Sequence, residues 1–356
     1  MPLLVRQPIR LHRVEGLGSL QMSLIERHFT SLEICAGAGG QALGLERAGF
    51  HHLALVEIDQ HACSTLRTNR PNWNVVGPPS GDGDIRNFSA VQFHGEVDLL
   101  AGGVPCPPFS VAGKQLGHMD DRDLFPEALR LMEECRPRAV MLENVRGLLD
   151  PTFESYRAAI CARLEEFGYK AEWRLLQAST FGVPQLRPRA ILVALRDEDH
   201  RHFQWPDDVP EEIRVPPTVG EALLDQMASN GWEGATDWAS NANAIAPTLV
   251  GGSRKHGGPD LGPTRARQAW AKLGVDGRLI ANEPPGQGFQ GMPQLTVRMA
   301  AIIQGFPDTW HFSGKKTPAY RQVGNAFPPP VAEAVGRAIS HAFVKTDSRS
   351  LAGVSR

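Results

Sequence analysis

One cysteine stands among prolines in "GGVPCPPFS", residues 102–110. Pro105, Pro107 and Pro108 restrict the backbone on both sides of Cys106, so its thiol is held in a fixed place, as a nucleophile requires. Free cysteine is also among the most buried residue types, and Cys106 therefore has a second interpretation as a small buried hydrophobe. The other motifs of the chain decide between the two.

A glycine-rich stretch, "AGAGGQALGLERAGF", lies upstream of this cysteine. Gly37, Gly39 and Gly40 would let the backbone approach a ligand and turn into a helix, whose first N–H groups favour an anion. The stretch also matches the G-x-G-x-x-A dinucleotide pattern, with Glu57 twenty residues after Gly37 to bind a ribose hydroxyl. Two ligand classes fit this pattern, a nicotinamide dinucleotide and S-adenosylmethionine.

Acidic residues follow other apolar runs. Glu57 ends "LALVE", Asp84 and Ile85 lie in "GDGDI", and Glu143 lies in "AVMLEN". Such carboxylates are often only helix caps or solvated turn residues. Here, however, Glu57 suits a ribose diol, Asp84 can accept from an adenine amino group, and Ile85 can pack on the ring. Together with the thiol and Glu143, they predict covalent chemistry beside a bound nucleoside.

The elements that position these residues alternate from Ser31 onward. Short, continuously apolar runs indicate strands of a sheet that is covered on both faces, and segments of helical spacing lie between them. We therefore predict a doubly wound, Rossmann-like α/β sheet, in which ligands bind at the carboxyl ends of the strands. The apolar runs span 31–36, 53–57, 97–102, 139–144 and 190–195; one helical segment holds Leu124, Ala128, Leu131 and Met132, and another holds Phe153, Tyr156, Ile160, Leu164 and Phe167.

The composition excludes several classes of protein. A chain of 356 residues with 42% hydrophobic and 21% charged residues and a net charge of -2 does not coat nucleic acid, although a local basic face is compatible with it. No apolar stretch reaches the roughly 18 residues of a membrane span, and we expect a cytoplasmic protein with no membrane partner. The 5 cysteines form no C-x-x-C pair, so we expect neither disulfides nor a metal site.

From about Ser31 to Val335, the motifs resemble those of the DNA (cytosine-5) methyltransferases of bacterial restriction-modification systems. "LEICAGAGG" resembles the family's cofactor motif, "VPCPPFS" its catalytic loop, "ENV" its acidic motif, and "QLRPRA" its Q-x-R-x-R motif. "RMAAIIQGFPDTW" and "QVGNAFPPPV" resemble its last two motifs. Two positions depart from the family pattern: Pro107 replaces the usual glutamine, and Cys35 stands where an aromatic residue usually covers the adenine.

The resemblance implies methyl transfer from S-adenosylmethionine to C5 of a cytosine in a specific sequence of duplex DNA. Addition of the Cys106 thiolate to C6 would make C5 nucleophilic enough to attack a sulfonium methyl group. Glu143, with a raised pKa, would share a proton with N3 and bind the exocyclic amine. Arg189 would hold the base at O2, and Arg187 would orient the catalytic loop. None of these groups reaches a stacked base, so the cytosine must flip out of the duplex.

The resemblance also implies the remaining site residues. We expect residues 110–122 to close over DNA as a lid, and the basic segment 251–278, with six Lys or Arg against two Asp, to contact phosphates and guanine edges. The predicted DNA contacts are Ser110, Lys114, Gln115, Arg254, Lys255, Arg265 and Arg267. The predicted cofactor contacts are Cys35, Ala36, Gly37, Gly39, Gly40, Glu57, Ile58, Asp84, Ile85, Pro105, Leu124, Asn325 and Ala326.

The domain organisation follows from these assignments. "PPPVAEAVGRAISHAF" predicts a helix started by proline that packs Val331, Val335, Ile339 and Phe343 on the sheet, and "PTRARQAWAKLG" predicts a short helix. We expect a monomer that acts on double-stranded DNA and has a cognate restriction endonuclease with the same target site. The predicted parts are a loose extension at 1–28, in which Met22 is an alternative start, a catalytic domain at 29–197 plus 316–345, a target-recognition domain at 198–315, and a flexible tail at 346–356.

Three alternative functions remain open. A tRNA cytosine-5 methyltransferase of the same fold would keep Cys106 and Glu143, although the long insert favours DNA. A nicotinamide oxidoreductase would explain the glycine loop but gives the cysteine, Glu143 and the R-x-R pair no joint role. A catalytically inactive DNA-binding protein would lack the nucleophile, and the intact set of motifs argues against it.

Overall fold

The computed structural model describes residues 28–105, 123–206, 215–251 and 259–354, the last five of these by backbone only. In these ranges seven strands form one sheet in the order β3-β2-β1-β4-β5-β7-β6. The strands are β1 Phe29–Ile34, β2 Phe50–Val56, β3 Val75–Val76, β4 Leu99–Gly102, β5 Ala139–Val145, β6 Tyr169–Gln177 and β7 Pro188–Arg196.

The predicted doubly wound α/β sheet is confirmed, and all five predicted apolar runs lie in or overlap its strands. Strands β1 to β5 pair in parallel, whereas β7 runs antiparallel to both β5 and β6. Strands β3 and β6 were not predicted from the sequence. Strand β6, "YKAEWRLLQ", lies at the sheet edge and mixes exposed charged residues with apolar ones, so it lacks the continuous apolar run of a central strand.

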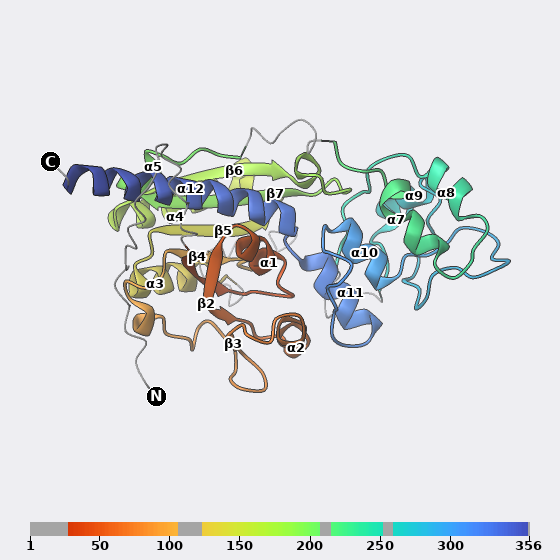
Figure 1. The fold of residues 1–356 in the computed structure, drawn as a ribbon, viewed down its shortest axis with the longest axis horizontal. Helices are drawn as coiled ribbons and strands as arrows, with labels where there is room; N and C mark the ends of the chain where they lie inside the picture. The colour runs from red at the N-terminus through yellow and green to blue at the C-terminus, as the bar shows by residue number, and fades with distance from the viewer. Residues whose placement is uncertain (1–27, 106–122, 207–214, 252–258, 355–356) are drawn as a thin grey trace, which may run out of the picture.

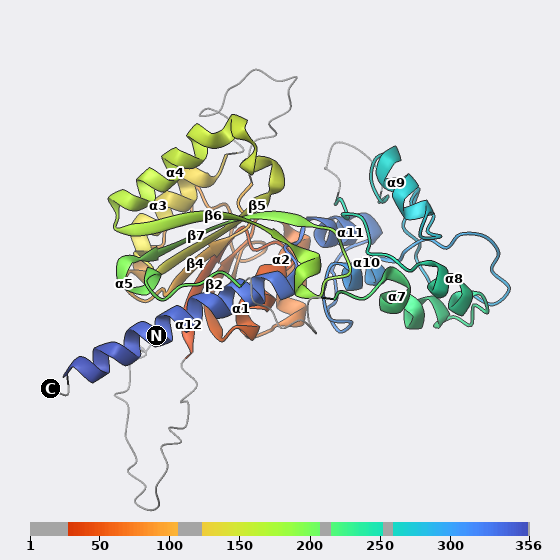
Figure 2. The same cartoon turned by 90° about the horizontal axis from the view of Figure 1, so that it is seen from above.

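Helices cover both faces of the sheet (Figure 1, Figure 2). Helices α1 (Gly40–Arg47) and α12 (Pro329–Val354) pack on one face, and α3 (Phe125–Cys135) and α4 (Glu154–Glu166) pack on the other. The predicted proline-started helix is α12, and the four residues predicted to pack on the sheet, Val331, Val335, Ile339 and Phe343, are all buried.

A group of helices gathers at one end of the sheet (Figure 1). Trp238, Trp270 and Tyr320 of this group share one apolar cluster with Leu43 of α1, so the core is continuous between the group and a helix that packs on the sheet. The short helix predicted in "PTRARQAWAKLG" is confirmed as α9. The group comprises α7 Val219–Ala228, α8 Ala235–Asn241, α9 Thr264–Ala271, α10 Val297–Ile303 and α11 Lys316–Asn325.

Shorter elements complete the described ranges. They are α2 Gln60–Asn69 and α5 Asp197–His200 with the 3-10 turns η1 Val91–Phe93, η2 Arg146–Leu149, η3 Pro151–Phe153 and η4 Ala178–Phe181. Within the residues that the structure describes, none of the helices is long and apolar enough to cross a bilayer.

Candidate active site

The glycine loop turns directly from β1 into α1. Cys35, Gly37 and Gly39 all have positive φ, at 51°, 55° and 85°, and α1 begins at Gly40. The two oxygens of Glu57 accept from the backbone N–H groups of Gly37 and Asp59, both at 2.7 Å. Glu57 therefore holds the glycine loop in place by hydrogen bonds. Its side chain also faces the space beside that loop.

A cavity of about 190 Å³ lies between this loop and the end of α11. Glu143 reaches it from β5, and Arg321 and Phe327 reach it from the segment around α11. Seven of the predicted cofactor residues line it, namely Cys35, Ala36, Gly37, Gly40, Glu57, Asn325 and Ala326. The cavity wall thus combines residues from the first and last motifs of the chain, as predicted for the cofactor site.

Glu33 and Gln41 are two of the nine lining residues that were not predicted from the sequence. Glu33, on β1, is 0% exposed, and neither of its carboxylate oxygens has a hydrogen-bond partner among the described residues. The amide nitrogen and oxygen of Gln41, on α1, are equally buried and unpartnered. Burial raises the pKa of Glu33 well above its usual range. A charged residue inside the apolar run "SLEICA" was the available signal, because buried carboxylates need a partner.

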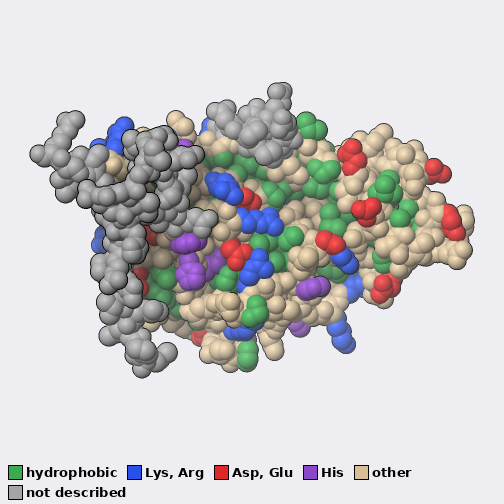
Figure 3. All heavy atoms as spheres, viewed as in Figure 1, with side chains coloured by type: hydrophobic (Ala, Val, Ile, Leu, Met, Phe, Trp, Pro, Cys, Tyr) green, Lys and Arg blue, Asp and Glu red, His purple; other side chains and the backbone are tan. Residues whose placement is uncertain are grey.

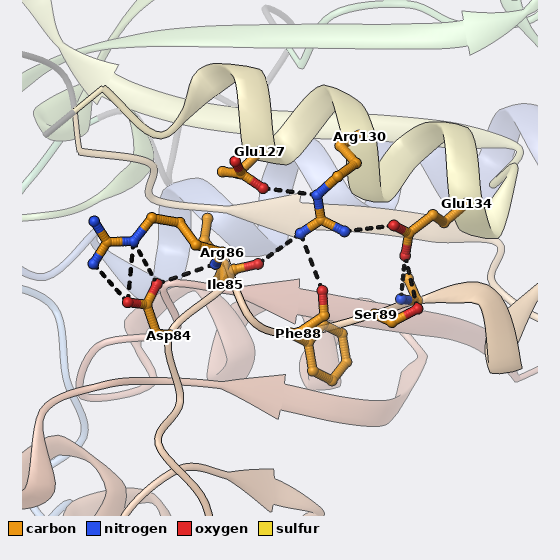
Figure 4. Close-up of polar contacts among 9 residues, drawn as sticks. Asp84, Ile85, Arg86, Phe88, Ser89, Glu127, Arg130 and Glu134 are labelled. Atoms are coloured by element: carbon orange, nitrogen blue, oxygen red, sulfur yellow. Dashed lines mark hydrogen bonds and ion pairs between the residues drawn. The ribbon is translucent and has the colours of Figure 1, made fainter. Parts of the chain in front are cut away.

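Three further predicted cofactor residues, Ile58, Asp84 and Ile85, lie in or beside the loop at 81–85 and are not among the residues that line the cavity. Gly83 has φ +68°, and a Cβ there would lie 1.9 Å from the Glu57 carbonyl oxygen, so the loop packs directly on the chain after β2. Asp84 lies on this loop, and Arg86 donates to both of its carboxylate oxygens (Figure 4). This contact lowers the pKa of Asp84. Ile85 is buried, and Ile58 is 56% exposed.

Three predicted cofactor residues contact other parts of the site. Gly39 packs against Trp310, whose indole N–H donates to the Ala38 carbonyl at 3.1 Å. Pro105 is exposed, and Leu124 precedes α3. The Leu124 N–H donates to the Pro105 carbonyl at 3.3 Å, so Pro105 and Leu124 lie together although 18 positions separate them along the chain.

Glu143 and Arg189 lie on the antiparallel strands β5 and β7 and form a buried ion pair, with 2.6 Å between Oε1 and Nε. Burial raises the pKa of Glu143 against the opposing effects of Arg189 and Arg187, in the direction that the sequence predicted. The neighbouring Asn144 donates from Nδ2 to the Val104 carbonyl at 2.8 Å. The acidic motif is thus bonded to the chain just before the predicted nucleophile.

Arg187 is buried and ties three segments together. It donates to the carbonyl oxygens of Leu249, Gly324 and Ala326 at 2.8, 2.8 and 3.0 Å. These contacts join the chain before β7 to the insert and to the wall of the cavity. The predicted role of Arg187 in orienting the catalytic loop stays a prediction.

Several predicted residues lie outside the described ranges: Cys106, Ser110, Lys114, Gln115, Arg254 and Lys255. Of the DNA contacts predicted on α9, Arg265 is exposed and Arg267 is partly buried. On the face seen in Figure 3, most of the described Lys and Arg lie over the middle of the molecule, whereas Asp and Glu predominate at the right-hand end. Among the residues that the structure describes, no group of His, Cys, Asp and Glu could hold a metal ion.

Two curated relatives are similar over most of the chain. The type II methyltransferase M.NgoMIV of Neisseria gonorrhoeae is 56% identical over 324 residues, which cover 89% of this chain and 99% of the relative. The type II methyltransferase M.NaeI of Lentzea aerocolonigenes is 57% identical over 315 residues, 88% of this chain and 75% of the relative.

Solved structures show the same fold at lower identity. A DNA modification methyltransferase encoded within an E. coli prophage has a TM-score of 0.59 at 22% identity, covering 89% of this chain and 99% of its own. A variant of Spodoptera frugiperda DNMT2 has a TM-score of 0.58 at 17% identity, covering 88% and 99%. The sequence model of the C-5 cytosine-specific DNA methylases matches residues 29–341. With this match and the cavity between its first and last motifs, the chain belongs to the C-5 cytosine-specific DNA methylase family.

Proposed function

We propose that this methyltransferase transfers a methyl group from S-adenosylmethionine to C5 of a flipped-out cytosine in a specific duplex DNA sequence, through a covalent bond between Cys106 and C6. The observation that carries the proposal is the buried Glu143–Arg189 pair at the cavity wall, bonded through Asn144 to the chain before Cys106. The similarity to M.NgoMIV and M.NaeI supports a role in a restriction-modification system, with a cognate endonuclease that shares the target site.

The cavity fits S-adenosylmethionine by the chemistry of its donors and acceptors. The unpartnered Glu33 carboxylate suits an ammonium group, and the lone pairs that Glu57 retains suit ribose hydroxyls. Arg321 pairs with Asp59 at 3.8 Å, and its guanidinium suits a carboxylate. When bound there, S-adenosylmethionine supplies the electrophilic methyl group.

The residues of the chain perform the other steps. The Cys106 thiolate forms a bond to C6 of the cytosine, and the electron pair displaced from the C5=C6 bond moves toward N3. Glu143 delivers a proton to N3, and Arg189 holds O2. When C5 takes the methyl group, S-adenosylhomocysteine is left and N3 returns its proton to Glu143. Loss of the C5 proton to a base then re-forms the C5=C6 bond and breaks the S–C bond, which returns the thiolate. The flipped base costs a few kcal/mol of lost stacking, which contacts in the pocket offset.

A duplex with 5-fluorocytosine at the target position tests the covalent step. Fluorine cannot leave as a proton does, so the methylated adduct should persist through denaturing electrophoresis when S-adenosylmethionine is present. Cys106→Ser should form no adduct, because a hydroxyl yields little nucleophile at neutral pH. Cys161→Ser is the matched control, since Cys161 is a partly exposed thiol on α4 outside the cavity, and it should trap normally. A DNA adduct mapped to any other residue would overturn the proposal.

The substrate is tested separately. Bisulfite sequencing of plasmid DNA from cells that express the chain should show methylation at one short sequence, which we expect to be a GC-containing palindrome, and Cys106→Ser should remove it. Tritium transfer from labelled cofactor should favour duplex DNA over tRNA. Transfer to tRNA alone would replace the proposed function by that of a tRNA methyltransferase of the same fold.

A further inference from the structure

Arg130, on α3, contacts a loop that is distant in sequence (Figure 4). Its Nη2 donates to the carbonyl oxygens of Ile85 and Phe88 at 2.7 and 3.0 Å. Its Nε pairs with Glu127 at 2.7 Å, and its Nη1 pairs with Glu134. The three nitrogen atoms of this guanidinium therefore bind partners on both the helix and the loop.

Glu134 also holds this loop, because its carboxylate accepts from an N–H group and a hydroxyl group of the loop. Its Oε2 accepts from the Ala90 N–H at 2.6 Å and from the Ser89 hydroxyl at 3.1 Å. Arg130 thus binds the carbonyl oxygens of segment 84–90, and its ion-pair partner binds the donors of that segment. Helix α3 thus contacts the loop through a donor, Arg130, and through an acceptor, Glu134.

The loop has little regular structure of its own. Segment 84–90 lies outside every helix and strand, and its internal backbone bonds are those from Asn87 and Phe88 to the Asp84 carbonyl. It carries Asp84 and Ile85, the two residues assigned to the adenine of the cofactor. A shift of the Ile85 carbonyl would move both of them.

A surface ion pair between helices gives a useful contrast. Arg163 of α4 pairs with Glu133 and Glu166 and lies 4.6 Å from the centroid of the Phe167 ring, so these contacts stay on the surface between α3 and α4. Exposed pairs of this kind contribute little to stability. Arg130 differs because it donates to two main-chain carbonyls of the loop that carries Asp84 and Ile85.

We propose that Arg130 is a positioning residue for the adenine end of the cofactor site: it fixes segment 84–90 so that Asp84 meets the 6-amino group of adenine. The inference rests on the proposed function, because it takes S-adenosylmethionine as the cofactor. It also predicts that loss of Arg130 weakens cofactor binding and leaves the chemical step almost unchanged, since Arg130 contacts the loop and not the reacting atoms.

The test compares Arg130→Met with Arg163→Met, which removes an equivalent charge from the α3–α4 surface. Binding is measured calorimetrically for S-adenosylhomocysteine and for S-inosylhomocysteine, in which a 6-oxo group replaces the 6-amino group. The wild type should prefer the adenine compound, because Asp84 would face a carbonyl in the other. Arg130→Met should weaken S-adenosylhomocysteine by roughly tenfold or more and reduce the preference by a similar factor. Arg163→Met should change neither value.

Turnover gives a second readout. The KM for S-adenosylmethionine should rise in Arg130→Met, while kcat at saturating cofactor stays within about threefold. Arg130→Lys keeps the charge, but one ammonium group cannot reproduce the planar fork, so it should fall between wild type and Arg130→Met. If Arg130→Met does not fold, as judged by circular dichroism, the lysine variant carries the comparison.

The outcomes distinguish the two hypotheses. Wild type that fails to bind S-adenosylhomocysteine would contradict the proposed function. Wild type that binds it, together with a folded Arg130 variant of unchanged adenine preference, would overturn the positioning role alone. A fall in kcat at unchanged KM would also overturn it.

Discussion

Glu143 Oε1 lies 2.6 Å from Arg189 Nε, and both side chains are buried between β5 and β7. The antiparallel pairing places Val145 opposite Arg189, so the two charges come from strands whose relative position is fixed by the sheet. Burial raises the pKa of Glu143 even with this cation beside it. The pair can therefore hold a proton at the carboxyl while keeping the guanidinium available to a neutral ligand oxygen.

Glu143→Gln should reduce turnover on the order of 100-fold, the usual scale for loss of a general acid. The amide has a similar shape but cannot deliver a proton, so binding of DNA and S-adenosylhomocysteine should remain. Single-turnover methylation and equilibrium binding measure the two effects. Turnover at the wild-type rate would remove Glu143 from the mechanism.

Arg189→Met should move the alkaline limb of the pH–rate profile to higher pH. Arg189 lowers the pKa of Glu143, so its removal raises that pKa further, and the protonated acid persists to higher pH. The rate itself should fall, because O2 of the base loses its donor, so the position of the limb is the measurement. Arg196→Met is the control, since Arg196 lies on the same strand but donates to the carbonyls of Pro137 and Arg136. Equal midpoints in both variants would contradict the coupling.

The parts of the site that sequence predicts well are those with local signals. The glycine loop needs positive φ at Gly37 and Gly39, and the strand ends at Glu57 and Glu143 follow apolar runs. These residues therefore lie near one another at the carboxyl ends of the strands, where ligands bind in sheets of this kind.

Other parts depend on contacts that no local pattern encodes. Arg130 reads as an ordinary residue of an amphipathic helix, and its contact with Ile85 spans 45 positions. Gln41 reads as a polar residue in the first turn of a helix, and only the packing of α1 on the sheet shows that it is buried. Strand β6 has a side-chain pattern too polar for a central strand, and its assignment depends on pairing with β7.

Glu33→Gln should stabilise the protein without cofactor and weaken cofactor binding. The pKa of Glu33 is raised by burial, so the wild type loses stability as pH rises above the unfolded value of about 4.3 toward the folded pKa. The amide does not titrate, and the difference in Tm between variant and wild type should therefore grow with pH above about 4. S-adenosylhomocysteine should bind roughly tenfold more weakly, because a charge-assisted contact is lost. Glu96→Gln, at an exposed position, is the control for both measurements.

His52→Gln should flatten the acid limb of the stability curve. His52 is buried, its Nε2 donates to the Ala42 carbonyl at 3.0 Å, and its Nδ1 accepts from the Ser31 hydroxyl at 2.7 Å. Burial lowers its pKa to about 4, so the wild type loses stability as pH falls from about 6.5 to about 4, by roughly 3 kcal/mol in all. Urea unfolding across this range measures the loss. His341→Gln, at an exposed position of α12, is the control and should keep the wild-type slope.

Arg265→Ala should weaken DNA binding by removing a phosphate contact. Arg265 is exposed on α9, in the region assigned to target recognition, and makes no ion pair among the described residues. A phosphate contact acts on every sequence alike, so affinity should fall for target and non-target duplexes together. The slope of log K against log salt should lose about 0.9, the value for one phosphate. Arg201→Ala, just after α5 at the opposite end of the sheet (Figure 1), should leave both affinity and slope unchanged. A changed target preference at constant slope would show instead that Arg265 contacts a base.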